Sequence, residues 1–228
     1  CHRSRRQTAA RSVGLTRSGM PDTELLVPRK RPTQERSKRK FQAMLGAARE
    51  LLIEVGVESL TCEEIAVRAE VPIGTLYQYF ANKYVIVCEL DRQDTVAVRE
   101  ELAAFAGGVP SLEWPHLLEK FLDHLAALWR NDPSRRAVWL AVQSTPSTRL
   151  TATQNERLLA ELVARALAPL TPSQRGRREM MSQVLVHTTY SLLSLSVQDV
   201  TQHEEIVAEL KRMLAGYLLL EESVAEGS

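Results

Sequence analysis

The sequence has few of the features that disulfide frameworks, metal sites or membrane spans require. Its three cysteines, Cys1, Cys62 and Cys88, lie far apart in a chain of 228 residues and have no metal-ligand spacing. The longest apolar stretch, residues 184–197, is too short to cross a bilayer, and residues 1–30 hold no apolar run of signal-peptide length. We therefore expect a cytoplasmic protein with no metal and no membrane partner.

Motifs of catalysis are also missing. No HExxH, GxSxG, Walker or GxGxxG motif occurs in the context that its chemistry needs. The five histidines show no metal-ligand spacing, and Cys88 has no histidine near it in the sequence. We expect the protein to be neither an enzyme nor dependent on a cofactor.

The charge of the chain is distributed unevenly. The formal net charge is +1, but residues 1–40 carry 12 Lys and Arg against 3 Asp and Glu, and the remainder carries 17 against 25. A basic arm on an acidic body is typical either of an arm that meets a polyanion or of a solvated, disordered tail. Residues 1–32 have no hydrophobic period, and we expect residues 1–35 to be a disordered basic arm.

Hydrophobic periodicity predicts an all-α protein of about nine helices. Apolar residues recur at helical spacing from Phe41 to Val55, and Gly56 is expected to end this first helix. Thr61 and Ser111 are expected to cap later helices, as are the pairs Asp132-Pro133 and Thr171-Pro172. The later helices are expected after Thr61, from Pro72, at 83–105, 111–130, from 133, at 148–168, at 172–200 and at 202–222.

Residues 61–80 have the pattern of a helix-turn-helix, because a short helix is followed at once by Val71-Pro72 and another helix. A helical projection of the second helix places Ile73, Leu76 and Phe80 on one apolar face. The opposite face presents Gly74, Thr75, Tyr77 and Gln78. Glutamine can pair with adenine and a threonine methyl can contact thymine, so this outer face is suited to the major groove of DNA. The alternative is a short amphipathic helix whose tyrosines cover the edge of a core.

The segment LTCEEIAVRAEVPIGTLYQYFANK, residues 60–83, resembles the DNA-binding signature of the TetR family of transcriptional regulators. Glu70, Pro72 and Ile73 depart from the usual residues of that signature. The resemblance implies a helix-turn-helix domain at 36–82, a ligand-binding and dimerisation domain at 83–223, and a tail at 224–228. It implies a ligand-responsive repressor that binds a palindromic operator in double-stranded DNA as a homodimer, and that a small hydrophobic effector releases.

Carried onto this sequence, the resemblance implies a set of DNA-contacting residues. Thr61, Tyr79 and Lys83 are expected to meet phosphates, although a solvated lysine is an equal alternative for Lys83 taken alone. The full set is Arg39, Lys40, Thr61, Pro72, Ile73, Gly74, Thr75, Tyr77, Gln78, Tyr79 and Lys83.

The C-terminal half provides two further expectations. Residues 180–197 and 206–220 are apolar on nearly all sides, which favours helices buried against both a core and a partner chain. The expected dimer contacts are Val184, Leu192, Leu210, Met213, Leu214, Tyr217 and Leu218. Aromatic and polar residues at helical spacing predict an effector pocket, with an ordinary core as the alternative. The expected pocket residues are Phe121, Leu125, Trp129, Trp139, Gln143, His187, Tyr190 and Ser194.

A different class of function is also compatible with an all-helical chain, namely an interaction protein without a DNA partner. The basic arm and the outward Gly-Thr-Tyr-Gln face favour the DNA-binding alternative.

Overall fold

The computed structural model describes residues 26–107, 114–168, 175–198 and 200–226. These residues form nine α-helices, one short 3₁₀ helix and no strand, which confirms the predicted all-α class. The helices are α1 (Glu35–Ser59), α2 (Cys62–Arg68), α3 (Ile73–Tyr79), α4 (Lys83–Gly107), α5 (Trp114–Asn131), α6 (Pro133–Val142), α7 (Pro146–Ala166), α8 (Arg175–Ser196) and α9 (His203–Glu226), with η2 (Val200–Gln202) before the last.

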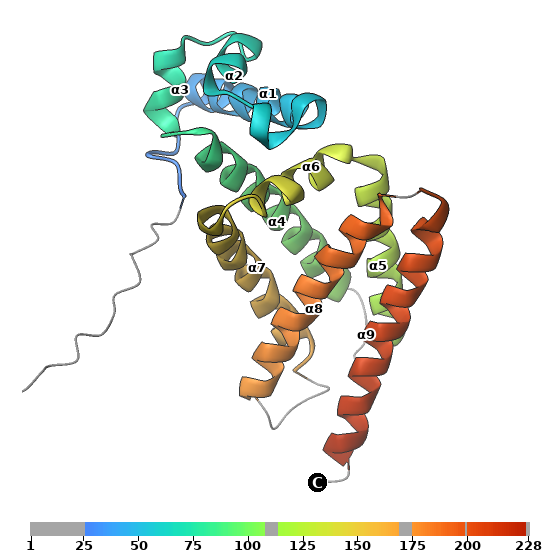
Figure 1. Ribbon diagram of the computed structural model, residues 1–228. Helices are drawn as coiled ribbons and strands as arrows, with labels where there is room; N and C mark the ends of the chain where they lie inside the picture. The colour runs from blue at the N-terminus through green and yellow to red at the C-terminus, as the bar shows by residue number, and fades with distance from the viewer. Residues whose placement is uncertain (1–25, 108–113, 169–174, 199, 227–228) are drawn as a thin grey trace, which may run out of the picture.

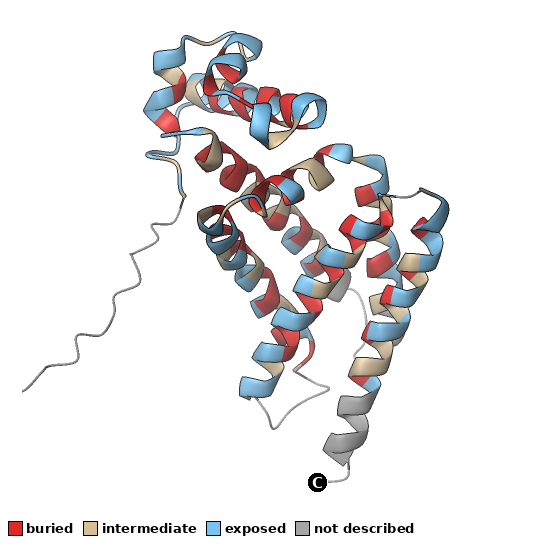
Figure 2. Ribbon diagram, viewed as in Figure 1, coloured by how far each residue is buried: buried red, intermediate tan, exposed pale blue. Residues whose placement is uncertain are grey.

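The helices form two parts (Figure 1). α1, α2 and α3 make a small bundle at one end, and α4–α9 make a larger body, with α4 leading into it from the bundle. In the body α4 packs on α7, α7 on α8, and α8 on α9, while α1 packs on α6 and joins the two parts. The buried residues lie on the inward faces of the helices (Figure 2), as expected when amphipathic helices surround a common core.

The helix ends follow local signals in several places. Thr61 caps α2, because its Oγ1 accepts a hydrogen bond from the Glu64 N–H at 3.2 Å. Asp132 caps α6 in the same way by accepting from the Ser134 N–H at 3.0 Å. Gly56 breaks α1 with φ 71° and ψ 173°, a conformation that essentially only glycine adopts, although helical residues continue to Ser59. The predicted caps Ser111 and Thr171-Pro172 lie outside the described residues.

Three helix boundaries in the described residues differ from the prediction. α7 begins at Pro146, where Thr145 and Thr148 form a reciprocal capping box, and not at residue 148. Pro72 is the N-cap of α3, so the helix starts at Ile73. α9 continues to Glu226, so the expected tail at 224–228 is helical as far as it is described.

The N-terminal arm differs more strongly from the prediction. Residues 26–34 are non-helical, and long-range hydrogen bonds join them to α3, α4 and α7. The prediction of a disordered arm up to residue 35 is therefore wrong for this segment. Residues 1–25 lie outside the described part of the chain. Among the described residues, no helix combines the length and the apolar character that crossing a membrane requires.

Candidate nucleic-acid interface and effector cavity

The outer face of α3 is the first candidate site. Leu76 and Phe80 have no exposed surface, and the Phe80 ring stacks on Phe41 of α1 with centroids 4.9 Å apart. Anchored in this way, α3 leaves Gly74, Tyr77 and Gln78 exposed, with Pro72 and Ile73 beside them and Thr75 partly buried. The short helix α3 is therefore anchored on α1 and presents a mostly polar face to solvent. The exposed residues of α3 lie on the face that the helical projection predicts, with the addition of Ile73.

Ile73 is 38% exposed, so its predicted place on the buried face is wrong. It is the first residue of α3, at the end of the helix farthest from the Phe41–Phe80 contact. Its side chain is thereby available on the same surface as Gly74 and Tyr77.

Contacts with α2 fix the side chain of Tyr77. The Tyr77 hydroxyl donates to Glu63 Oε1 at 3.3 Å, which joins α3 to the first turn of α2. The Thr61 hydroxyl in that turn donates to Glu64 Oε2 at 2.7 Å while it caps the helix. Two of the expected DNA-contacting hydroxyls thus have intramolecular partners in the free protein.

Tyr79 and Lys83 lie differently from the expected phosphate ligands. Tyr79 is 6% exposed, because its ring packs edge-on against Phe41 with centroids 5.5 Å apart. Lys83 Nζ donates to the Val57 and Glu58 carbonyl oxygens at 2.8 and 3.0 Å. Lysine near a helix C-terminus can satisfy the last free carbonyls. Lys83 therefore caps the C-terminal end of α1, and it is neither the phosphate ligand nor the solvated lysine that the sequence suggested.

The expected basic residues lie at the start of α1. Arg39 is exposed and Lys40 is partly buried, and Arg36 and Lys38 of the same turns are exposed as well. Lys38 Nζ is 2.8 Å from Glu35 Oε1. The start of α1 therefore offers exposed guanidinium groups of the kind that bind phosphate.

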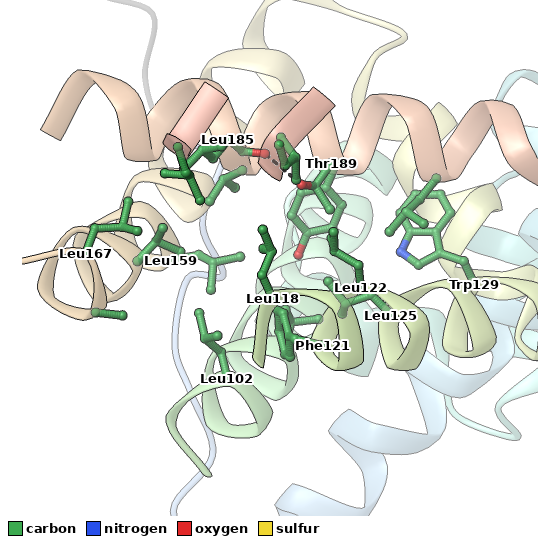
Figure 3. Close-up of a pocket in the computed structure, with 18 residues that line it drawn as sticks. Leu102, Leu118, Phe121, Leu122, Leu125, Trp129, Leu159, Leu167, Leu185 and Thr189 are labelled. Atoms are coloured by element: carbon green, nitrogen blue, oxygen red, sulfur yellow. Dashed lines mark hydrogen bonds between the residues drawn. The ribbon is translucent and has the colours of Figure 1, made fainter. Parts of the chain in front are cut away.

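The second candidate site is a cavity of about 130 Å³ in the body, between α4, α5, α7, α8 and α9 (Figure 3). Phe121, Leu125, Trp129 and Tyr190 line it, as the sequence predicts. Hydroxyl groups come only from Thr189 and Tyr190 among the lining residues. Thr189 Oγ1 donates to the Leu185 carbonyl at 2.7 Å, whereas the buried Tyr190 hydroxyl has no hydrogen-bond partner among the described residues. The cavity is thus apolar with one unsatisfied polar group.

Four of the predicted pocket residues do not line this cavity: Trp139, Gln143, His187 and Ser194. Trp139 instead stacks on the Tyr190 ring, with centroids 5.6 Å apart and an interplanar angle of 14°. The side chain of His187 is 63% exposed and its Nδ1 lies 3.2 Å from Glu156 Oε2, so α8 turns His187 towards solvent and α7. Sequence reasoning missed Val98 and Leu102, which α4 contributes to the wall. The helical period of α4 was the signal that could have indicated them.

The predicted dimer residues separate into two groups. Val184 and Met213 are 47% and 52% exposed, and Leu192 and Tyr217 are partly buried. Leu210, Leu214 and Leu218 are buried within the single chain, so their expected place in an interface is wrong. The face of α9 that carries them packs on α5 and α8, and Leu214 and Leu218 line the cavity.

An anchored helix-turn-helix on a helical body is the arrangement of a DNA-binding transcriptional regulator. Residues 44–90 match the family model described as "Bacterial regulatory proteins, tetR family", and residues 112–222 match "Tetracyclin repressor-like, C-terminal domain". The chain belongs to the TetR family of transcriptional regulators, as the resemblance implies.

Several relatives are similar to the chain. It is 37% identical over 79 residues to the HTH-type transcriptional repressor KstR of Mycolicibacterium smegmatis, a match over 34% of this chain and 37% of KstR. It is 21% identical over 186 residues to the regulator UidR of Escherichia coli K12, over 77% of this chain and 91% of UidR.

Two solved structures share the fold. The fatty acid degradation regulator FadR of Bacillus halodurans has a TM-score of 0.64 at 19% identity, over 82% of this chain and 97% of FadR. Thermus thermophilus FadR, solved in complex with lauroyl-CoA, has a TM-score of 0.58 at 22% identity, over 78% of this chain and 92% of that one.

Proposed function

We propose that this regulator is a cytoplasmic repressor that binds a palindromic operator as a homodimer through the outer face of α3. The observation that carries the proposal is the division of α3 into a buried face of Leu76 and Phe80 and an exposed face around Gly74 and Gln78. Glutamine on such a face can form a bidentate pair with adenine. The exposed cations at the start of α1 are suited to the flanking phosphates.

The test begins with selection of bound sequences from random duplex DNA, which gives the site and its symmetry. On the selected operator, Gln78→Ala should lose roughly 1–3 kcal/mol of discrimination at one base position in each half-site. Binding to unrelated duplex should hardly change, because phosphate contacts supply it. An equal loss on every sequence would show that Gln78 does not read a base. A wild-type protein without salt-dependent retention on DNA would favour the interaction-protein alternative.

We further propose that a small apolar molecule, or the apolar end of a larger one, binds in the cavity and releases the operator. An engineered apolar cavity of about 150 Å³ holds benzene, so the volume of about 130 Å³ suits a group of that size. A longer chain would need the helices to move apart. Such movement would also shift α3, because α4 both lines the cavity and follows directly after α3.

The unpaired Tyr190 hydroxyl defines the polar end of this effector. A buried hydroxyl without a partner costs about 1–3 kcal/mol, which a ligand can recover by hydrogen bonding to it. Burial raises the pKa of Tyr190, and the nearby carboxylates of Asp91, Asp94 and Glu156 raise it further, so the hydroxyl stays neutral. We therefore favour an effector with a neutral or cationic head group. The acyl-CoA bound to Thermus thermophilus FadR supports an apolar chain as the part that enters.

Trp129 and Trp139 allow a direct titration, since Trp129 lines the cavity and Trp139 stacks on Tyr190. Decanol, decylamine and decanoate share one chain and differ in their head groups, so they separate the two parts of the proposal. From the change in tryptophan fluorescence, we expect decanol and decylamine to bind more tightly than decanoate does. Tyr190→Phe, which keeps the ring, should weaken the binding of decanol by about fivefold to tenfold. Identical affinities with and without operator duplex would rule out a ligand switch.

The dimer is proposed to form through the outer surface of α8 and α9. The exposed apolar side chains there include Val184, Leu195 and Met213, and Leu192 lies beside them partly buried. A patch of large apolar side chains on a soluble protein is typical of an interface. This surface leaves the buried face of α9 to the core of each chain.

A further inference from the structure

Residues 26–34 form a non-helical segment, the strap, that lies between the body and α3 and bends at Arg29 (Figure 1, blue, before α1). Pro28 and Pro32 fix their own φ angles and disfavour helix in the residues before them. The two prolines therefore reduce the conformational entropy that the strap loses when it docks.

One part of the strap binds the C-terminal end of α3. The Arg29 N–H donates to the Tyr79 carbonyl at 2.8 Å, and Arg29 Nη1 donates to the Tyr77 carbonyl at 2.8 Å. The last carbonyls of a helix have no partner within the helix, so Arg29 satisfies two of them for α3. Lys30 Nζ lies 5.1 Å from the centroid of the Tyr79 ring, which adds a cation–π contact.

The remaining contacts bind the strap to the body. Arg31 donates to both carboxylate oxygens of Glu89 on α4, at 2.5 and 2.8 Å. The Glu89 side chain is only 1% exposed and also accepts from Arg92 at 2.7 and 2.9 Å. At the start of the strap, the Leu26 N–H donates to Thr151 Oγ1 of α7 at 3.0 Å. The strap thus connects α3 with the two helices that contribute Val98 and Leu159 to the cavity.

Arg31 and Glu89 form the strongest of these links. Burial alone would raise the pKa of the Glu89 carboxyl, but the hydrogen bonds from Arg92 and Arg31 outweigh it and lower the pKa. A bidentate arginine–carboxylate pair fixes distance and orientation together. A change at Arg31 therefore loosens the strap without removing a side chain from the face of α3.

We infer that the strap is a further tether that holds α3 at a set angle to the body, with Arg29 and Arg31 as positioning residues. Residues 80–82 link α3 to α4, and α1 packs on α6, so the small bundle is already joined to the body at two places. The strap adds an attachment at the C-terminal end of α3 itself, which restricts movement of α3 relative to α4 and α7. In a dimer, an α3 that could move relative to the body would let the protein bind half-sites at several different spacings. The consequence for spacing rests on the proposed function.

Arg31→Gln in the full-length chain tests the inference, and Arg92→Gln is its matched control. Both variants take one arginine from Glu89, but only Arg31→Gln frees the strap. In hydrogen exchange of the free protein, we expect the amides of 76–80 to exchange about threefold to tenfold faster in Arg31→Gln than in Arg92→Gln. Equal exchange in the two variants would overturn the inference. If Arg31→Gln does not fold, Thr151→Val, which removes the anchor on α7, is compared with the control in the same way.

Operator spacing provides the second readout. Binding is measured on the selected operator and on versions with one base pair added or removed between the half-sites. The wild type and Arg92→Gln should lose about tenfold in affinity on the altered spacings, and Arg31→Gln clearly less. Equal losses in all three proteins would contradict the inference. A wild type without any preferred operator would instead disprove the proposed function, and the exchange experiment would still decide on the strap.

Discussion

Gly74 is a residue whose lack of a side chain has no internal explanation. It is exposed in the first turn of α3, and a Cβ added there would meet no atom within 4 Å. Its backbone is not in the left-handed region that would require glycine. The remaining physical reason for glycine is close approach of another molecule to the helix.

Gly74→Ala is therefore expected to stabilise the free protein by up to about 1 kcal/mol, because alanine favours helix. The same change should weaken operator binding about tenfold, since the methyl group enters the space between α3 and DNA. Thermal unfolding and operator titration measure the two effects. Gly46→Ala is the control, because Gly46 lies on α1 with equally open surroundings and is outside the α3 face. It should gain stability and keep its affinity. Unchanged affinity in Gly74→Ala would disprove the close approach.

Asp91 is a second residue of interest, because its carboxyl makes the stability of the fold depend on pH. Its Oδ2 accepts a hydrogen bond from Asn155 Nδ2 at 2.7 Å, and burial raises the pKa of its carboxyl from 3.8 to about 7. Between these values the folded chain binds more protons than the unfolded chain. The contribution of the Asp91 carboxyl to the free energy of unfolding must therefore fall as the pH rises from about 4 to 7, and it stays low above pH 7.

Asp91→Asn should remove this loss, because asparagine cannot ionise and can still accept from Asn155. Urea unfolding at pH 4 to 8 is expected to show a gain over wild type that grows up to pH 7 and then remains constant. Asp94→Asn is the contrasting control, because Asp94 pairs with Arg49 and its loss should destabilise the protein at pH 7. A difference between Asp91→Asn and wild type that does not vary with pH would contradict the prediction.

At the scale of elements, the turn between α2 and α3 contains backbone strain. Glu70 has a φ of 53°, in the left-handed region that costs a residue with a side chain about 1–2 kcal/mol. The turn is closed by hydrogen bonds from the Glu70 N–H to the Val67 carbonyl and from the Val71 N–H to the Ala66 carbonyl, at 3.1 and 3.0 Å. The positions of α2 and α3 thus depend on a residue in an unfavourable conformation.

Glu70→Gly is expected to raise the free energy of unfolding by about 0.5–1 kcal/mol, since glycine adopts this φ without strain and loses part of the gain to its flexible unfolded chain. Glu100→Gly, the same change at an exposed position of α4, should lower it by about 0.5–1 kcal/mol. Chemical denaturation measures both. Destabilisation by Glu70→Gly would mean that the glutamate side chain contributes more than the backbone strain costs.

At the scale of the whole molecule, the proposed dimer can be tested by one charge. Val184→Glu or Met213→Glu places a carboxylate on the exposed surface of α8 and α9, where burial in an interface without a partner is costly. We expect a folded monomer in sedimentation velocity at micromolar concentration. Leu140→Glu on α6, at a leucine of similar exposure, should leave the dimer intact. A wild type that sediments as a monomer would end the proposal.

The sequence by itself determined the features that depend on neighbours along the chain. The helical period of residues 41–55 and the caps at Thr61 and Asp132 are local, so these helices could be predicted. The same holds for the two faces of α3, because Leu76 and Phe80 lie four residues apart and Gln78 between them must point away.

Only the tertiary structure decided which groups meet across the fold. In α9, where residues 206–220 are mostly apolar, nothing local separates Leu214, which is buried in the core, from Met213, which is exposed. Nor does a local signal join Arg31 to Glu89, or Lys83 to the end of α1. These bonds link residues 25 or more positions apart, and their partners exist only once the helices have packed. The strap, residues 26–34, therefore has the composition of a disordered arm, and it is ordered because three separate helices provide its partners.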